Sequence, residues 1–495
     1  MTPPASTICC AGCDYQAGPA DPYPFRCPNS GTDDTDHVLT RVLHPALARF
    51  PAAPAAPADP NAPAAPVTPD AAADPPDAAA DPPDENPFLR YRTLMHSYHM
   101  ATASGLPDTA YRDLVAALDV SVAAVDGHGF QATPFFRSPE LSDALGFDRH
   151  GGVWVKDETG NVSGSHKGRH LMGVLIHLAV MERLGLLDPA RRRDLAIASC
   201  GNAALAAAVL ARAADWPLTV FVPPEADPRI LKQLNDLGAT VVTCPREPGA
   251  TGDPAYHRLR GELDHGALPF TTQGPENGLT IEGGLTLGYE LVTDLAGQPP
   301  DHPIGQPPDH PIGQPPLHHL IVQVGGGALA SSVIQALREA ADLGALARLP
   351  RVHTVQTTGA HPLEQAYERV RALLPDDPAP DTIRKTMAEA ARHRSAFMRP
   401  WPREPASVAT GILDDETYDW RAVTEGMLAT GGRPLVVSED SLTEANRLAV
   451  ARTGIPVDPT GSSGLAGLLE MRRSGLVGDH DRVAVVFTGL ERGTP

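Results

Sequence analysis

The chain has 495 residues, 60 of them acidic and 40 basic, for a net charge of −20. Its basic side chains are scattered, which argues against a nucleic-acid-binding surface. No apolar stretch reaches the ~18 residues of a membrane span. The start lacks the basic and apolar regions of a signal peptide, so we expect a soluble, cytoplasmic protein.

The first fifty residues carry four of the six cysteines. Cys10 and Cys13 have the C-x-x-C spacing of half a zinc ribbon, and Cys27 follows at a suitable distance. The position three residues after Cys27 holds no cysteine, so Cys9 or His37 would have to complete the ligand set. The alternatives are a zinc site on Cys10, Cys13 and Cys27, or a degenerate ribbon with reduced thiols.

Residues 51–87 form a low-complexity segment with twelve prolines and seven acidic residues. Alanine, proline and aspartate bury too little apolar surface to offset the conformational entropy of the chain. We therefore expect an acidic, disordered Pro/Ala linker between the cysteine-bearing segment (residues 1–50) and a globular part that spans residues 88–495.

In the globular part, short apolar runs alternate with stretches of helical periodicity. The runs predict strands at 195–198, 218–222, 240–242, 320–324, 352–355 and 483–487. The helical stretches include 202–214, 228–237, 328–343 and 441–453. This alternation predicts an α/β fold in which parallel sheets are flanked by helices. Ligands of such sheets bind beyond the carboxyl ends of the strands.

Residues 297–316 interrupt this pattern with two copies of GQPPDHPI and the start of a third. Three prolines in each copy exclude a helix or a central strand. We interpret the repeat as a duplication in a surface loop, with metal binding by His302 and His310 as the alternative.

Lys167 lies in the first turn of a helix that continues through residues 171–187. A lysine there is unusual because the positive end of the helix dipole disfavours a second positive charge. The position should lower the pKa of the amine, which suits a lysine that must be neutral to react with a carbonyl group. The alternative is a solvated lysine at a helix start.

Gly325, Gly326 and Gly327 connect a predicted strand to a predicted helix. Such a turn directs backbone N–H groups toward one phosphate. It also fits the dinucleotide pattern loosely, but the strand 352–355 is followed by Gln356, so the acidic ribose ligand is missing. This opposes a nicotinamide-dependent oxidoreductase. The remaining alternative is that the glycines only allow close packing of helix on strand.

Two further strand ends, Ser199-Cys200-Gly201-Asn202 and Thr488, complete a set of motifs in a familiar order. Together they resemble the fold-type II pyridoxal-phosphate enzymes, the tryptophan synthase beta-chain superfamily. The resemblance extends from about Pro87 to the carboxyl end. It implies a two-domain catalytic region over residues 88–495, with a smaller subdomain at about 165–268.

The resemblance also implies a role for each motif. Lys167 would bind the cofactor through an imine and act as the catalytic base. The remaining contacts implied are Asn202 with the phenolic oxygen of the cofactor, Gly325, Gly326, Gly327, Ala328 and Leu329 with its phosphate, Thr488 with its pyridine nitrogen, and Ser199, Cys200 and Gly201 with the substrate carboxylate. A neutral hydroxyl at the pyridine nitrogen makes the ring a weaker electron sink, which favours elimination or replacement at the β-carbon.

The branch of the superfamily is less uniform. Residues 87–92 resemble the opening of the threonine synthase catalytic domain, but His166 and Gly168 replace the usual neighbours of the lysine. The phosphate loop is nearer to that of threonine/serine dehydratases. We expect a homodimeric pyridoxal-phosphate-dependent lyase that acts on a hydroxy- or phospho-hydroxy amino acid. The alternative is a catalytically silent ligand-binding or regulatory protein.

Two expectations follow for particular segments. A phosphorylated substrate needs basic residues in the pocket, for which Arg169, Lys156 and Arg433 are candidates. The polar linker suggests that the chain up to about Asn86 is dispensable for cofactor binding.

Overall fold

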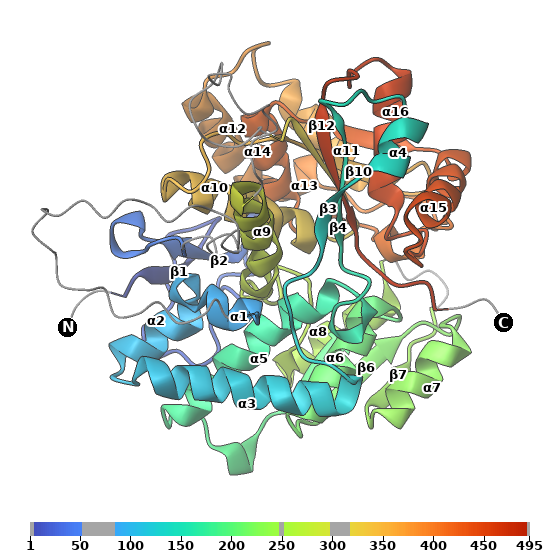
Figure 1. The fold of residues 1–495 in the computed structure, drawn as a ribbon. Helices are drawn as coiled ribbons and strands as arrows, with labels where there is room; N and C mark the ends of the chain where they lie inside the picture. Colours follow the sequence, from blue (N-terminus) through green and yellow to red (C-terminus); the bar gives the residue numbers. More distant parts are fainter. Residues whose placement is uncertain (1–3, 52–84, 247–251, 298–316, 493–495) are drawn as a thin grey trace, which may run out of the picture.

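The computed structural model describes residues 4–51, 85–246, 252–297 and 317–492 (Figure 1). Most of the predicted linker lies outside these ranges, as does the predicted proline-rich loop with His302 and His310. Within them, no helix is both long and apolar enough to cross a membrane.

The larger sheet has six strands in the order β11-β10-β9-β12-β4-β3. All neighbouring strands are parallel except β3, which pairs antiparallel with β4 at one edge. The strands are β3 (Phe135–Ser138), β4 (Gly152–Asp157), β9 (His319–Gln323), β10 (Arg351–Thr357), β11 (Pro434–Val437) and β12 (Arg482–Phe487).

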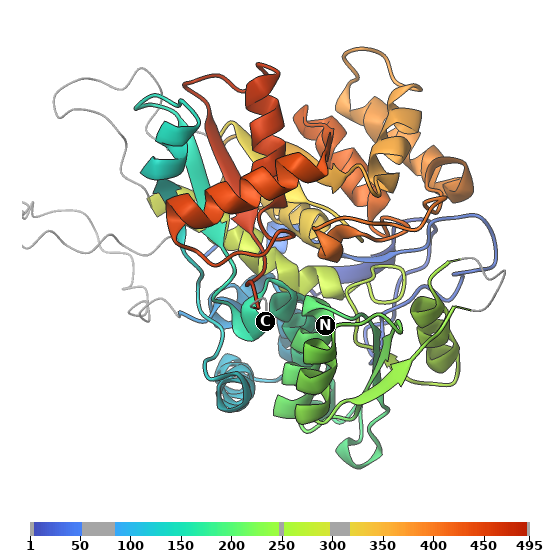
Figure 2. The ribbon, with the colours of Figure 1, turned by 90° about the vertical axis from the view of Figure 1, so that its right-hand side faces the viewer.

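Both faces of this sheet are buried. Val483 and Val485 of β12 pack in one apolar cluster with α15 and α16, whereas Ala484 and Val486 pack in another with α10 and α14. Figures 1 and 2 show these helices on opposite sides of the sheet. This confirms the predicted fold class, because strands covered on both faces are expected to read as continuous apolar runs.

The smaller sheet has four parallel strands in the order β7-β6-β5-β8. They are β5 (Leu195–Ala198), β6 (Leu218–Val222), β7 (Thr240–Thr243) and β8 (Leu268–Pro269). This sheet lies almost entirely within the predicted subdomain at 165–268. That domain division remains a prediction.

Helices make up most of the other regular structure, and the four predicted helices are found within two residues of the expected bounds. The helices are α1 (Pro87–Arg90), α2 (His96–Ala103), α3 (Asp108–Asp126), α4 (Pro139–Ala144), α5 (Lys167–Arg183), α6 (Asn202–Ala213), α7 (Pro228–Asp236), α8 (Pro254–Asp264), α9 (Thr280–Gly297), α10 (Ala328–Asp342), α11 (Pro362–Arg371), α12 (Pro380–Arg392), α13 (Arg394–Phe397), α14 (Trp420–Thr430), α15 (Glu439–Thr453) and α16 (Ser463–Arg473).

The amino-terminal segment packs against the rest of the molecule. Its strands β1 (Ser6–Cys10) and β2 (Leu39–Leu43) form an antiparallel pair beside α9 and α10 (Figure 1). Arg41 is buried and forms ion pairs with Glu339 at 2.6 Å and with Glu282 at 3.6 Å. Removing the segment would leave these carboxylates buried without their cation, which is costly. We therefore no longer expect the first 86 residues to be dispensable.

Candidate active site

Lys167 is the first residue of α5, as predicted, and follows a tight turn at Ser163, whose φ is 61°. Its amine donates a hydrogen bond to Thr272 Oγ1 at 3.2 Å. Burial lowers the pKa of this amine, and Asp414 and Asp419 only partly oppose the effect. The direction agrees with the expectation from the helix dipole, but burial is the main cause.

The glycine turn connects β9 to α10. Gly327 has a φ of 102°, a left-handed conformation that favours glycine, and its position at the start of α10 has no side-chain cap. An added Cβ at Gly325 would collide with Asp414 Oδ2, and one at Gly326 would lie 2.9 Å from the ring of Tyr418. The turn therefore presents uncapped helix amides in a space where other chain segments approach closely.

Two buried carboxyl groups lie against this turn, and both come from the irregular segment 413–419. The Asp419 N–H donates to the carbonyl of Gly326 at 2.9 Å. Burial raises the pKa of Asp414 to about 6, although Lys167 and the Gly326 amide oppose the shift. Burial also raises the pKa of Asp419 to about 8, and its Oδ2 has no hydrogen-bond partner. The site thus holds one lysine between two acids that burial makes hard to ionise.

Thr488 follows β12 and is buried. Its Oγ1 accepts a hydrogen bond from Gln323 Nε2 at 2.9 Å. The same amide nitrogen is 2.7 Å from the carbonyl of Gly461 and 3.1 Å from that of Val486, and carbonyl oxygens only accept, so the orientation of the Gln323 amide is fixed. Thr488 must accept from Gln323, which leaves its own O–H available to a ligand.

Asn202 begins α6 and is tied to residues near the carboxyl end of the described chain. Arg492 donates to Asn202 Oδ1 at 3.1 Å and also to the carbonyl of Ser163. Gly489 forms an antiparallel bridge with Ser165, two residues before the lysine. Residues 489–492 therefore connect the Lys167 turn to the start of α6.

The segment Ser199-Cys200-Gly201 connects β5 to α6. Gly201 precedes the helix and provides no side-chain cap, so the first amides of α6 are open to an anion. Burial raises the pKa of the Cys200 thiol, and Asp253 and Asp414 add to the shift. A neutral thiol and open amides are compatible with binding of a carboxylate here.

The structure thus brings the predicted residues together at the ends of β5, β9 and β12 and at the start of α5. Sequence reasoning missed several neighbours of these residues. They are Thr272, Gln323, Asp414, Asp419 and Arg492.

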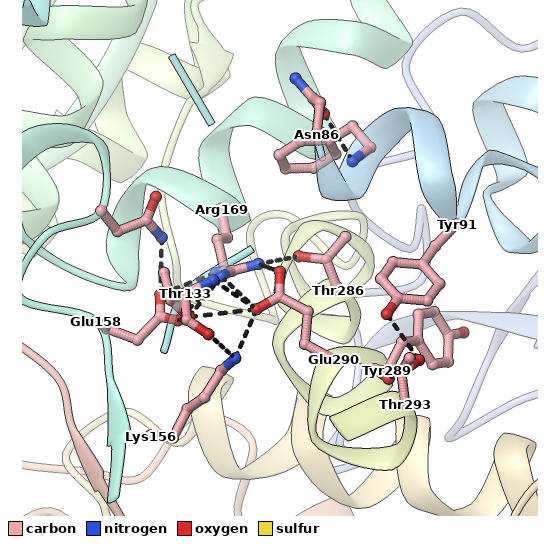
Figure 3. A network of polar contacts seen from close by, with 12 residues as sticks. Asn86, Tyr91, Thr133, Lys156, Glu158, Arg169, Thr286, Tyr289, Glu290 and Thr293 are labelled. Carbon is pink, nitrogen blue, oxygen red and sulfur yellow. Dashed lines mark hydrogen bonds and ion pairs between the residues drawn. The ribbon is translucent and has the colours of Figure 1, made fainter. Parts of the chain in front are cut away.

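Two of the basic residues considered for a phosphorylated substrate are engaged in a buried network (Figure 3). Arg169 donates to Glu158 at 2.8 Å and to Glu290 at 2.6 Å. Lys156 donates to Glu290 and to the Thr133 carbonyl, each at 2.7 Å. Burial would lower the pKa of Arg169, but the two glutamates raise it above its usual value. These cations are already neutralised.

Arg433, the third candidate, precedes β11, and its N–H donates to His353 Nδ1. This contact lies before the start of β11, whereas the residues around Lys167 follow the carboxyl ends of strands. The arginine is therefore at the opposite end of the sheet from the site.

The family model described as pyridoxal-phosphate dependent enzyme matches residues 128–489 of the chain. The chain belongs to this family. The match confirms the resemblance stated from the motifs, and it spans Lys167, the glycine turn and Thr488.

Known members of the pyridoxal-phosphate dependent enzymes resemble the chain at low identity. The threonine synthase of Methanocaldococcus jannaschii is 23% identical over 72% of this chain and 74% of its own length. That of Mycobacterium bovis is 24% identical over 77% and 86%. An L-serine dehydratase of Saccharomyces cerevisiae is 28% identical over 44% of this chain and 59% of its own length.

Solved structures share the fold. A threonine deaminase, that of T.th., has a TM-score of 0.52 and 21% identity, over 77% of this chain and 99% of that one. Maize serine racemase has a TM-score of 0.52 and 17% identity, over 77% and 93%. These likenesses concern the fold alone.

The residues of this member fit the family's cofactor. An uncapped helix start would accept a phosphate, a buried lysine of lowered pKa would react with an aldehyde, and a hydroxyl with a free hydrogen would meet a ring nitrogen. Asp414 is the one group that opposes a phosphate at the turn. Its raised pKa allows it to be protonated there, and the protonated carboxyl can donate to a phosphate oxygen.

Proposed function

We propose that this chain is a pyridoxal-phosphate-dependent lyase that eliminates or replaces the β-hydroxyl group of a small hydroxy amino acid such as serine or threonine. One observation carries the proposal: the buried Lys167 amine lies between uncapped glycine amides and two protonatable carboxyl groups, with no free cation described among its neighbours. When bound, the cofactor supplies an aldehyde and a conjugated ring that accepts electron density from the α-carbon.

The side chains of the site would divide the work as follows. Gly325–Leu329 would hold the phosphate with backbone amides, and the Thr488 hydroxyl would donate to the ring nitrogen. Ser199 to Gly201 would bind the substrate carboxylate, beside Asn202 at the start of α6. Lys167 would take the proton from the α-carbon, because burial favours its neutral, basic form.

The leaving group is the point at which charge decides. A phosphate ester carries about −1.5 to −2 charges near neutral pH and requires cations close by. Arg169 and Lys156 are neutralised by Glu158 and Glu290, and the segment on the glycine turn brings further acids. A neutral hydroxyl meets no such repulsion, and a protonated carboxyl group beside it can donate a proton as it leaves.

The names of the relatives support both branches of the expectation. Threonine synthases match more of the chain, whereas the matched dehydratase is slightly more identical over a shorter stretch. Neither identity decides the substrate, so the electrostatic argument carries the choice.

The experiment is a substrate panel on purified, cofactor-loaded protein. L-serine, L-threonine and O-phospho-L-homoserine are each supplied, and release of ammonia, 2-oxoacid, phosphate and threonine is measured. We expect ammonia and 2-oxoacid from serine or threonine, with little phosphate release. Phosphate and threonine from the phosphorylated substrate would overturn the hydroxyl specificity. Bound cofactor with no product from any substrate would support a silent binding protein.

Two further parts of the proposal are independent of the substrate. A zinc ion in the amino-terminal segment would take Cys10, Cys13 and Cys27 as three of its ligands. The expected homodimer is tested by light scattering on the purified chain, in which a monomer mass would contradict it.

A further inference from the structure

We infer that His37 completes a closed, tetrahedral zinc site with Cys10, Cys13 and Cys27, and that this site fixes the segment that covers the glycine turn. The second part rests on the proposed cofactor site, whereas the first does not.

The four donor atoms already have the spacing of a tetrahedral metal site. All lie within 4.8 Å of one another. Cys13 Sγ is 3.7 Å from Cys27 Sγ, and His37 Nδ1 is 3.5 Å from Cys10 Sγ and 3.6 Å from Cys27 Sγ. Zn–S bonds of about 2.3 Å and Zn–N bonds of about 2.05 Å predict edges of about 3.8 Å and 3.6 Å. These separations match, and 3.7 Å is far too long for a disulfide bond.

The surroundings of these donors also suit a metal. Asp33 Oδ1 lies 3.0 Å from His37 Nε2, so it would accept a hydrogen bond from the nitrogen that does not face the metal. The Gly12 N–H and the Asn29 side-chain amide each donate to a cysteine sulfur at 3.4 Å. Hydrogen bonds of this kind stabilise metal-bound thiolates and fix ligand orientation.

The donor set selects the metal class. Three thiolates and one imidazole are soft and borderline ligands, which favour Zn²⁺ over Mg²⁺ or Ca²⁺. Four protein ligands leave no open position for water or substrate, so the site would be structural rather than catalytic.

The loops that carry these ligands contact the far segment 391–421. The Asp36 N–H donates to the Ala391 carbonyl at 2.8 Å, and Arg394 donates to the Asp36 carboxylate at 3.2 Å. Arg394 also pairs with Glu416, and Arg421 donates to the Ala11 carbonyl, between two of the cysteines.

Glu416 and Arg421 flank Asp419 in the chain, and Asp414 lies two residues before Glu416. The metal loops therefore hold both sides of the segment that lies on the glycine turn. Since an ordered cover should favour a bound cofactor over the free protein, zinc occupancy should be coupled to cofactor affinity.

The first test measures metal content on the full chain by mass spectrometry after purification without chelators. We expect one zinc per chain in the wild type and loss of the zinc in Cys27→Ser and His37→Ala. Cys9→Ser and Cys244→Ser are matched controls, because these thiols lie outside the cluster. His37→Cys should keep the metal as a four-cysteine site. Cobalt loaded in place of zinc should show the visible spectrum of tetrahedral cobalt thiolate.

The result that would overturn the site is wild-type protein without stoichiometric zinc, or equal zinc in Cys27→Ser and in the controls. A Cys13–Cys27 disulfide in freshly purified, unreduced protein would also overturn it. Because some variants could fail to fold, zinc release from the wild type on titration of its thiols with an organomercurial provides an independent measure.

The second test measures the dissociation constant of pyridoxal phosphate before and after chelation of the zinc, with no substrate present. We expect about tenfold weaker binding without zinc, within the usual range of coupling between two sites. Readdition of zinc should restore the affinity. Unchanged affinity would overturn the coupling. Failure of the lyase reaction would affect neither measurement.

Discussion

Lys167 and Arg169 are two residues apart at the start of the same helix, yet their surroundings are opposite. Arg169 and Lys156 face Glu158 and Glu290, so two cations meet two carboxylates through short hydrogen bonds. Lys167 faces two carboxyl groups that burial makes hard to ionise, and one of their oxygens has no partner.

The difference separates a structural network from a reactive site. Matched charges with complete hydrogen bonding hold β4, α5 and α9 together and have little left to offer a ligand (Figure 3). Unmatched groups with shifted pKa values are retained at a cost in stability and are typical of sites that bind or react.

The sharpest break of the comparison is Lys167→Ala, which should lower turnover by about 10³-fold or more through loss of the general base. The visible absorbance of bound cofactor should disappear as well. Product release and an absorbance spectrum measure both. Lys385→Ala is the control, since this lysine is exposed and pairs only with Asp381 among the contacts described. Cofactor trapped by borohydride on another lysine would show that the wrong residue was chosen.

Arg169→Met should affect stability instead. Removal of one member leaves Glu158 and Glu290 buried without their cation, at a cost of about 3–5 kcal/mol in the free energy of unfolding. Chemical denaturation measures the loss, with the exposed Arg452→Met as the matched change. A loss below about 1 kcal/mol, as for a surface pair, would contradict the network's structural role.

Asp419→Asn should alter the pH dependence of stability. The folded pKa of about 8 lies above the unfolded value, so the contribution of Asp419 is present below about pH 4 and is lost as pH rises through 8. Lys167, whose pKa is lowered, acts in the opposite sense, so the two chains must be compared at each pH.

Melting temperatures of the cofactor-free protein between about pH 5 and 8.5 measure this dependence. The variant should gain stability relative to the wild type as pH rises, by about 1–3 kcal/mol at the upper end. The exposed Asp377→Asn serves as control. Parallel curves for wild type and Asp419→Asn would show that this carboxyl group is ionised throughout.

Asp414→Asn should have the smallest effect, on cofactor affinity. With a folded pKa of about 6, Asp414 is largely ionised at pH 8 and repels a phosphate at the glycine turn. The variant should bind pyridoxal phosphate several-fold more tightly at pH 8, with little change at pH 5. Titration of the cofactor at both pH values measures this. Weaker binding at both would mean that Asp414 holds the turn in shape instead.

Sequence reasoning reached the parts of the site that lie on regular elements. Lys167, Asn202 and the three glycines begin helices directly after a turn or a buried strand, and apolar periodicity locates such positions. Gly168, which departs from the threonine synthase pattern, has a local reason: an added Cβ would lie 2.9 Å from the Val162 carbonyl.

The groups that sequence reasoning missed lie in irregular segments. Asp414 and Asp419 are some ninety residues beyond the glycine turn, with no periodicity to place them. His37 is ten residues after Cys27, without the spacing of a second C-x-x-C pair. The packing of the first fifty residues was missed because the linker's composition says nothing about what its two ends contact.

The short segment 488–492 has a consequence for synthesis. It provides Thr488, the Gly489 bridge to Ser165 and the Arg492 contact to Asn202. A nascent chain that has already made Lys167 and the glycine turn still lacks these contacts until Arg492 has left the ribosome. Since a chain emerges with its amino-terminal part first, cofactor capture is expected to be post-translational, after most of both sheets can form.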